Sequence, residues 1–373
     1  MTVGARWRRL VCAVVAAVLA GCGGGGSART PVLPDLSLAQ LAGQRVIYSY
    51  QGLTPPAGLL DLLRHGEAAG VIFFGGNIAS TAQIAGVISQ LDTANASPDN
   101  PLRTLPLLLL TDQEGGLVRR LPGAPLLSDK QIGASADPSS EATGAGTGAG
   151  QTLAGVGMNV NLAPVLDVYR APGDFDDQFG RSYSSDPGAV SALGANFITA
   201  QQATGVAATA KHFPGLGAAA SFQNTDEQPV TLNVSQADLR SIDEYPFKAA
   251  ISSGVKLVMA SWAVYPALDP SRPAGLSPTI IGGELRQRLG FAGVTITDAL
   301  EAGALQAFGT TGQRATLAAS AGMDLILCSS QDLDQGEQAR TALQQSLSPG
   351  TLNHAAFTAA VERITSLRSS LRR

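Results

Sequence analysis

The chain has 373 residues, of which 45% are hydrophobic and only 14% are charged. This composition allows a large buried core, and the length after a short leader is within reach of one α/β barrel. The formal net charge is −4. The acidic balance argues against a nucleic-acid partner and against attachment to anionic lipid through a basic patch.

The first 21 residues are typical of a secretory leader. Three arginines stand between positions 6 and 9, and an uncharged apolar run follows over 10–20. That run is shorter than the about 20 residues that span a bilayer. It closes on Leu-Ala-Gly-Cys at 19–22, which resembles a bacterial lipobox. In such signals the thiol of the cysteine, here Cys22, is lipidated. The alternative is an ordinary signal peptide with an incidental Cys22.

We therefore expect three segments: a lipoprotein signal over 1–21, a flexible glycine-rich tether over 22–36, and one folded domain over 37–373. Without residues 1–21 the chain keeps 22 basic and 29 acidic residues. Only Cys328 then remains as a free thiol in the fold, so no intrachain disulfide is available. The expected location is the outer face of the cytoplasmic membrane, with a lipid-anchored and monomeric protein.

Short apolar runs recur at wide spacing along the chain, and most are separated by stretches that could form a helix. Uninterrupted apolar runs are typical of parallel strands that are covered on both faces. Eight strand–helix units predict a single-domain (β/α)8 barrel. The eight runs are 45–50, 70–74, 106–112, 158–164, 205–213, 256–262, 293–298 and 323–328.

The glycine-rich stretch GAGTGAG at 144–150 has the composition of a nucleotide-binding loop but not its context. No strand precedes it and no acidic ribose partner follows, so we interpret it as part of a tightly packed helix. Histidine, cysteine and aspartate do not cluster at metal-ligand spacing. We expect neither a metal nor an organic cofactor.

Polar residues stand at the ends of three of the predicted strands. Asp112 ends the third, Lys211 and His212 end the fifth, and Asp298 ends the seventh. In a barrel the carboxyl ends of the strands build the active site, and an unpaired carboxylate is too costly to bury as a core residue. We expect these side chains to converge on one pocket.

Several motifs in the correct order resemble glycoside hydrolase family 3, most closely its single-domain bacterial β-N-acetylhexosaminidases. The resemblance covers about residues 37 to 328. It implies a carbohydrate substrate and retaining exo-hydrolysis of a β-linked amino sugar or related β-glycoside, with cell-wall fragments as one candidate source. The motifs are DQEGGLVRRLP (112–122), APVLDV (163–168), FGRSYSSDP (179–187), KHFPG (211–215), YPALDPSRPAGLSP (265–278) and LRQRLGFAGVTITDAL (285–300).

The resemblance also implies roles for single residues. Asp298 matches the catalytic nucleophile, since retaining hydrolysis needs a carboxylate that attacks the anomeric carbon. Asp167 is expected to be structural. The positions that match sugar ligands are Asp112, Arg120, Arg181, Lys211 and His212.

The chain departs from the family pattern where the proton donor belongs. The family has His-Gly after Lys-His-Phe-Pro-Gly and then Asp-Ser-His, whose histidine is the general acid and base. Here Leu216 replaces the first histidine, and the later segment is SFQNTDEQP at 221–229. Trp262 replaces a histidine after the sixth strand, and Leu117 replaces an arginine after Glu-Gly-Gly.

Three interpretations stay open. Asp226 or Glu227, on the same loop, has taken over the acid role, as carboxyl groups do in most glycosidases. Alternatively, the enzyme is slow and depends on good leaving groups. In the third interpretation the protein binds sugar without turnover. Both acids could also be solvated loop charges, and Asp226 falls near a non-catalytic acid of the family.

Overall fold

The computed structural model describes residues 1–2, 33–348 and 350–371. The predicted leader, the lipidation site Cys22 and most of the predicted tether lie outside the described residues. Within the described part, no helix has the length and hydropathy to cross a membrane.

The core is a barrel of eight parallel strands, in the order β11-β8-β7-β6-β3-β2-β1-β12. A parallel bridge between Ile296 and Leu325 joins the two outer members and closes it. The (β/α)8 prediction is confirmed, and each strand lies within one of the eight predicted runs. Their bounds are β1 Val46–Tyr48, β2 Gly70–Ile72, β3 Leu108–Thr111, β6 Val160–Asn161, β7 Ala207–Phe213, β8 Leu257–Ala260, β11 Val294–Thr297 and β12 Ile326–Leu327.

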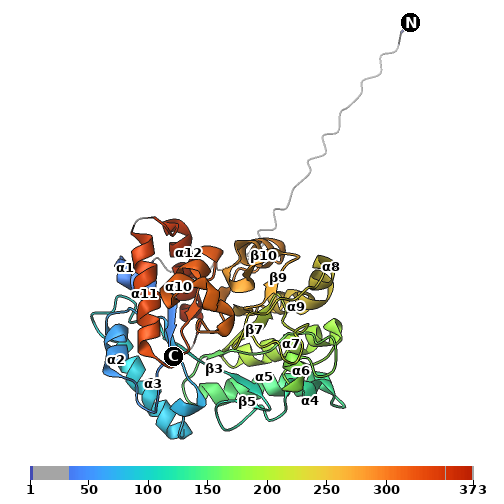
Figure 1. The fold of residues 1–373 in the computed structure, drawn as a ribbon, viewed down its shortest axis with the longest axis horizontal. Helices are drawn as coiled ribbons and strands as arrows, with labels where there is room; N and C mark the ends of the chain where they lie inside the picture. Colours follow the sequence, from blue (N-terminus) through green and yellow to red (C-terminus); the bar gives the residue numbers. More distant parts are fainter. Residues whose placement is uncertain (3–32, 349, 372–373) are drawn as a thin grey trace. The chain divides into compact units, whose positions relative to one another are not determined.

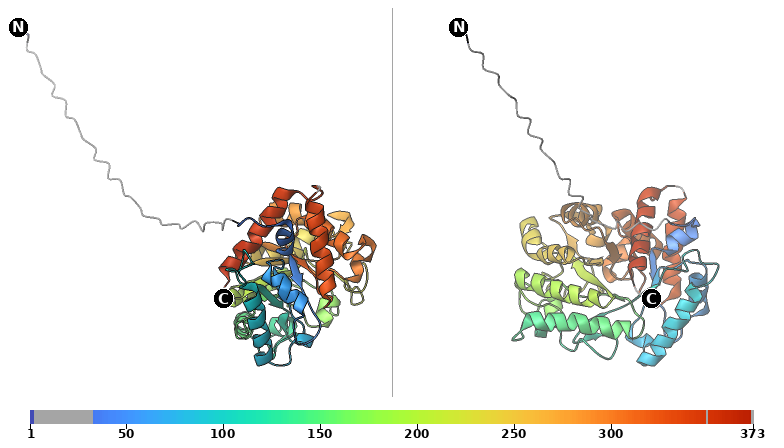
Figure 2. Two further views of the ribbon diagram at one scale, coloured as in Figure 1. Left: turned by 90° about the vertical axis from the view of Figure 1, so that its left-hand side faces the viewer. Right: turned by 180° about the vertical axis from the view of Figure 1, so that it is seen from behind.

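Helices surround the sheet on its outer side (Figures 1 and 2). The prediction that helices separate most of the strands is confirmed, for example by α3 before β3 and α7 before β7. The α-helices are α1 Leu38–Gly43, α2 Ala57–Arg64, α3 Thr81–Asn95, α4 Asp129–Gly133, α5 Pro138–Ala154, α6 Phe175–Gln178, α7 Pro187–Ala203, α8 Gln236–Asp238, α9 Tyr245–Ser252, α10 Thr311–Ala321, α11 Leu333–Leu347 and α12 His354–Ser370.

Short helices and hairpins complete the loops. Two segments are wide, π-type turns, η2 Leu239–Asp243 and η4 Thr279–Arg288, and the latter stands where the helix before β11 is expected. The 3₁₀ segments are η1 Gly75–Asn77, η3 Ala274–Leu276 and η5 Gly303–Phe308. Two small antiparallel pairs lie outside the barrel: β4 Gln113–Gly115 with β5 Val118–Arg119, and β9 Val264–Tyr265 with β10 Asp269–Pro273.

The glycine-rich stretch lies inside α5, where it packs against α7. A Cβ atom on Gly146 would lie 2.3 Å from the carbonyl oxygen of Phe197, and one on Gly150 would lie 2.2 Å from Thr204 Oγ1. Small residues are therefore required because the two helices approach closely. This confirms the interpretation as a packed helix.

A buried carboxylate strengthens the closing seam of the barrel. Asp324, just before β12, accepts hydrogen bonds from Arg286 (2.6 Å), Arg363 (2.7 Å) and the backbone N–H of Thr295 (2.9 Å). It thereby links η4, α12 and β11 next to the bridge that closes the sheet. Cys328, the one free cysteine of the described residues, is buried, as expected.

Candidate active site

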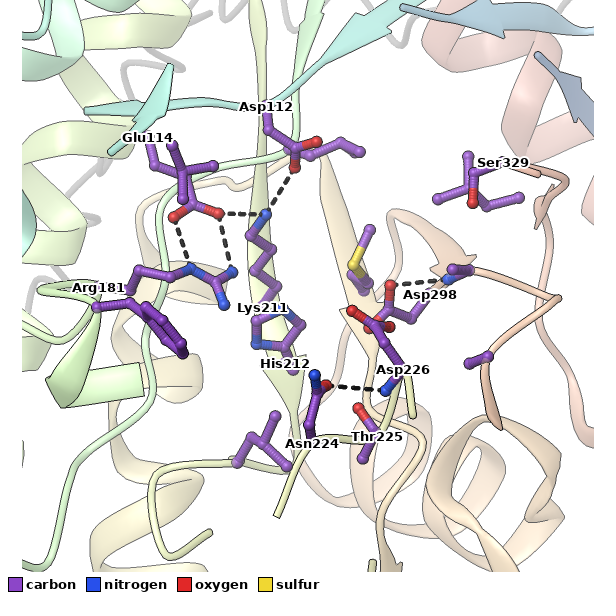
Figure 3. Close-up of a pocket in the computed structure, with 18 of the residues that line it drawn as sticks. Asp112, Glu114, Arg181, Lys211, His212, Asn224, Thr225, Asp226, Asp298 and Ser329 are labelled. Carbon is purple, nitrogen blue, oxygen red and sulfur yellow. Dashed lines mark hydrogen bonds and ion pairs between the residues drawn. The ribbon is translucent and has the colours of Figure 1, made fainter. Parts of the chain in front are cut away.

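A cavity of about 460 Å³ opens at the carboxyl ends of the barrel strands (Figure 3). It collects side chains from β3, β7, β11 and the loops that follow them, which is the position of active sites in barrels of this type. Its charged lining residues are Asp112, Glu114, Arg120, Arg181, Lys211, His212, Asp226, Asp298 and Glu301.

One wall of the cavity is a buried network of ion pairs. Lys211 Nζ lies 2.9 Å from Asp112 Oδ1 and 2.7 Å from Glu114 Oε1. Arg181 binds both oxygens of Glu114, at 2.9 and 3.0 Å, and its Nη1 lies 2.8 Å from Asp176 Oδ1. Each cation thus binds two carboxylates. These ion pairs hold the N–H donors and carboxylate acceptors in fixed positions, where they can form hydrogen bonds with sugar hydroxyls.

The network determines the charge of its members. Burial alone would lower the pKa of Lys211, but Asp112 and Glu114 outweigh it and raise that pKa above its ordinary value. Burial would likewise raise the pKa of Glu114, but Arg181 and Lys211 hold it far below its usual range. Lys211 and Glu114 are therefore both charged at neutral pH.

His212 is oriented by a second buried carboxylate. Its Nδ1 lies 2.6 Å from Asp167 Oδ2, while Asp167 Oδ1 accepts from the backbone N–H of Leu216 at 2.6 Å. Burial opposes protonation of His212, but Asp167 outweighs it and raises the pKa of the imidazole. Asp167 thus fixes both the histidine and the start of the following loop, which fits the structural role expected for it.

Asp167, Asp176 and His212 also have ligand atoms within 4.8 Å of one another, the spacing of a metal site. His212 Nδ1 and Asp167 Oδ2 already form one ion pair, and Asp176 Oδ1 forms another with Arg181. Among the described residues, Asp176 Oδ2 has no hydrogen-bond partner. Burial raises the pKa of Asp176 to about 7, so this carboxyl group is partly protonated at neutral pH.

Asp112 and Arg120 flank a tight hairpin, β4–β5, and both face the cavity. Gly115 (φ 127°) and Gly116 (φ 53°) make its turn, and a Cβ on Gly115 would lie 2.2 Å from the carbonyl oxygen of Leu127. The positive φ angles favour glycine at both positions, and at position 115 a side chain also has no room. Arg120 Nε is buried without a partner in the described structure, so it is free to donate to a ligand.

Asp298 follows β11, and the next peptide unit orients its carboxylate. Oδ1 accepts from the N–H of Ala299 at 2.7 Å, and the carbonyl of Ala299 accepts from Trp262 Nε1 at 2.8 Å. Trp262 is fully buried. The tryptophan that replaces a family histidine therefore supports the backbone next to Asp298 instead of contacting the cavity.

Asp226 stands beside Asp298 on the same side of the cavity (Figure 3). Its loop is tied to the segment after Asp298 by two backbone hydrogen bonds, from Gly303 N to Asp226 O (2.7 Å) and from Ala304 N to Thr225 O (3.0 Å). A Cβ on Gly303 would lie 2.1 Å from the carbonyl oxygen of Glu227. Glycine at 303 is what lets the two loops meet.

The surroundings of Asp226 favour its protonated form. Although the residue is exposed to solvent in the open cavity, partial burial of the carboxyl group and the negative charge of Asp298 raise its pKa to about 6, against the opposing effect of His212. A carboxyl group whose pKa is raised by a neighbouring carboxyl group, so that it holds its proton up to about pH 6, is typical of the general acid in a glycosidase pair.

The structure distinguishes Asp226 from Glu227, the two loop acids between which the sequence could not choose. Asp226 lines the cavity; Glu227 does not, and its residue is exposed. The other sequence-predicted residues of the fold share this cavity, namely Asp112, Arg120, Arg181, Lys211, His212 and Asp298.

Sequence reasoning missed Glu114, Asp176 and Glu301. Glu114 could have been found, because it stands two residues after Asp112 in a strand-like stretch, where alternate side chains share a face. Asp176 lies in the short helix α6 and Glu301 in the turn after β11, and no sequence signal marked either of them. Glu301 is held by Ser329 Oγ at 2.8 Å and Gln335 Nε2 at 2.9 Å.

Comparison with known proteins places this site in a family. Residues 36–367 match the model of the glycosyl hydrolase family 3 N-terminal domain. An uncharacterized secreted glycosyl hydrolase of Arthroderma benhamiae is 45% identical over 337 residues, which cover 90% of this chain and 94% of that protein. A β-hexosaminidase of Stenotrophomonas maltophilia is 34% identical over 278 residues, covering 72% of this chain and 78% of that one.

Solved structures agree. A family 3 β-N-acetylglucosaminidase from Paenibacillus superposes with a TM-score of 0.84 at 34% identity, covering 90% of this chain and 63% of that one. A β-N-acetylhexosaminidase from Beutenbergia cavernae gives a TM-score of 0.80 at 32% identity, covering 90% and 99%. The chain belongs to glycosyl hydrolase family 3, and it is a glycosidase.

Proposed function

We propose that this protein is a retaining exo-β-N-acetylhexosaminidase in which Asp298 is the nucleophile and Asp226 the general acid and base. The observation that carries the proposal is the pairing of these two carboxyl groups in one cavity, with the pKa of Asp226 raised to about 6. Relatives named β-hexosaminidase and β-N-acetylglucosaminidase support an N-acetylated amino sugar as the substrate.

The first half-reaction uses both carboxyl groups. An oxygen of Asp298 attacks the anomeric carbon while the bond from that carbon to the leaving oxygen breaks. The proton of Asp226 passes to the leaving oxygen, which departs as an alcohol. The product is a glycosyl ester on Asp298 and a carboxylate at Asp226.

The second half-reaction restores both groups. The Asp226 carboxylate takes a proton from water, and the resulting hydroxide oxygen bonds to the anomeric carbon as the ester bond to Asp298 breaks. Asp112, Arg120, Arg181, Lys211 and His212 hold the sugar hydroxyls in both steps. Two displacements at one carbon retain the β configuration.

We expect Asp112→Ala to weaken the binding of a β-configured iminosugar by about 2 kcal/mol, the scale for loss of a hydrogen bond to a charged group. Calorimetric titration gives the affinity. Asp334→Ala, which removes an exposed carboxylate on α11, is the matched control and should bind as the wild type does. An unchanged affinity in a folded Asp112→Ala protein would remove this residue from the sugar site.

The two proposed catalytic carboxyl groups should differ in their substrate dependence. Asp298→Ala should abolish hydrolysis of every substrate. Asp226→Ala should lower turnover of natural disaccharides by about 10² to 10⁴, the usual contribution of a positioned acid. The loss in kcat/KM for aryl glycosides with acidic leaving groups should be much smaller, because kcat/KM reports the first half-reaction and those groups leave without a proton.

Two further readouts belong to the same assays. In the wild type, kcat/KM for an unactivated substrate should fall as pH rises through about 6, because the Asp226 proton is lost there. A 2-fluoro glycoside should label Asp298, which peptide mass spectrometry detects. Ligand binding with neither labelling nor turnover would instead identify a sugar-binding protein. Equal loss on all substrates in Asp226→Ala would contradict its acid role.

We also propose that the protein is a lipoprotein of the outer face of the cytoplasmic membrane, anchored through Cys22, with cell-wall fragments as its substrates. The support is the basic and apolar leader that ends in Leu-Ala-Gly-Cys.

Cys22→Ser should move the protein from the membrane fraction to the soluble fraction, because the lipidated thiol is lost. Fractionation followed by immunoblotting measures this, with Cys328→Ser as the control for loss of a thiol inside the fold. A Cys22→Ser protein that stays in the membrane fraction after cleavage of its leader at another site would refute the anchor.

A further inference from the structure

The mouth of the cavity is apolar on the side of the β4–β5 hairpin and α6. Leu117, Val118, Phe175 and Phe179 line it there, and we call these four residues the apolar rim. Leu117 is 79% exposed and Phe179 44% exposed. Lys211 and Glu114, by contrast, are buried, so these two sugar-site groups lie deeper in the cavity than Leu117 and Phe179.

The apolar rim is held in place by one shared support. A Cβ on Gly116, next to Leu117, would lie 2.6 Å from Ser128 Cβ, and a Cβ on Gly180, next to Phe179, would lie 3.1 Å from Ser128 Oγ. Both glycines therefore pack against Ser128, which brings Leu117 and Phe179 to the same region. Phe175 and Phe179 stack edge to face with centroids 5.6 Å apart.

Two carboxyl groups of the cavity lack a paired cation among the described residues. Asp226 and Glu301 line the cavity, and neither has a cation within ion-pair distance in the described part of the chain. Leu117 stands where the family pattern has an arginine. Carboxylates without a paired cation in the cavity disfavour an anionic leaving group, whereas the apolar rim favours an apolar one.

We propose that the apolar rim is a subsite for an uncharged aglycone with an alkyl or aryl surface. The inference rests on the proposed function, because an exo-acting glycosidase that holds the sugar hydroxyls deep in its cavity directs the leaving group through the mouth. An apolar aglycone at the mouth covers Leu117 and Phe179, and removal of apolar surface from water favours binding. The structure therefore assigns the specificity for the leaving group to side chains that the sugar itself does not contact.

The test is a series of n-butyl, n-hexyl and n-octyl 1-thio-β-N-acetylglucosaminides, which bind without being cleaved. Affinities are measured by calorimetry below the micelle concentration. The wild type should gain about two-fold in affinity per methylene, the value for half-burial of each group. Leu117→Asn should flatten this dependence. Leu126→Asn changes a leucine that is 69% exposed and outside the cavity, and should keep the wild-type dependence.

The matching O-alkyl glycosides separate failure of this inference from failure of the proposed function. Their leaving groups have nearly equal acidity, so kcat/KM should rise with chain length as the affinity does. Hydrolysis that is independent of chain length, or an unchanged dependence in Leu117→Asn, would overturn the subsite and leave the glycosidase intact. Binding that depends on chain length without any hydrolysis would support the subsite and overturn the proposed function.

Discussion

The catalytic arrangement depends on one close approach, between the loop that carries Asp226 and the segment that follows Asp298. Gly303 and Ala304 donate backbone hydrogen bonds to the carbonyls of Asp226 and Thr225, and no side chain larger than hydrogen fits at position 303. The two carboxyl groups come from different barrel strands, yet their backbones are directly joined. Burial and the negative charge that this join brings next to Asp226 raise its pKa to about 6, so the same contact that positions the proposed acid also shifts its titration towards neutral pH.

The side chains of the rest of the cavity differ in chemical character between its buried part and its mouth. Lys211, Arg181 and Glu114 satisfy one another's charge below the surface, and so they can be buried without the penalty of an unpaired ion. Asp298 and Asp226 have no paired cation among the described residues, and so they remain available for reaction. The outermost surface is apolar, with Leu117 and Phe179 exposed. A substrate is thus held by its hydroxyls at the bottom and cleaved in the middle, and its leaving group extends over the apolar rim.

Much of this could be predicted from the sequence, because the features involved are local. Eight apolar runs predicted the eight strands, and polar residues directly after them, such as Asp112 and Asp298, predicted which side chains share a cavity. The choice between Asp226 and Glu227 could not be predicted. Neighbouring loop residues have no periodicity to separate them, and the backbone contact with Gly303 that decides it joins segments about 80 residues apart. The role of Trp262 could not be predicted either, because its hydrogen-bond partner, the carbonyl of Ala299, lies 37 residues away in the sequence.

The central claim, that Asp226 is the proton donor and acceptor, is tested most directly by anion rescue of Asp226→Ala. Without the carboxylate, water is no longer activated and the glycosyl ester on Asp298 persists, whereas azide needs no base to attack it. With an activated aryl glycoside, added azide should speed turnover about ten-fold or more, and the product should be the β-glycosyl azide. An α-glycosyl azide would mean that Asp226 is the nucleophile. Turnover that does not respond to azide would mean that another group supplies the proton.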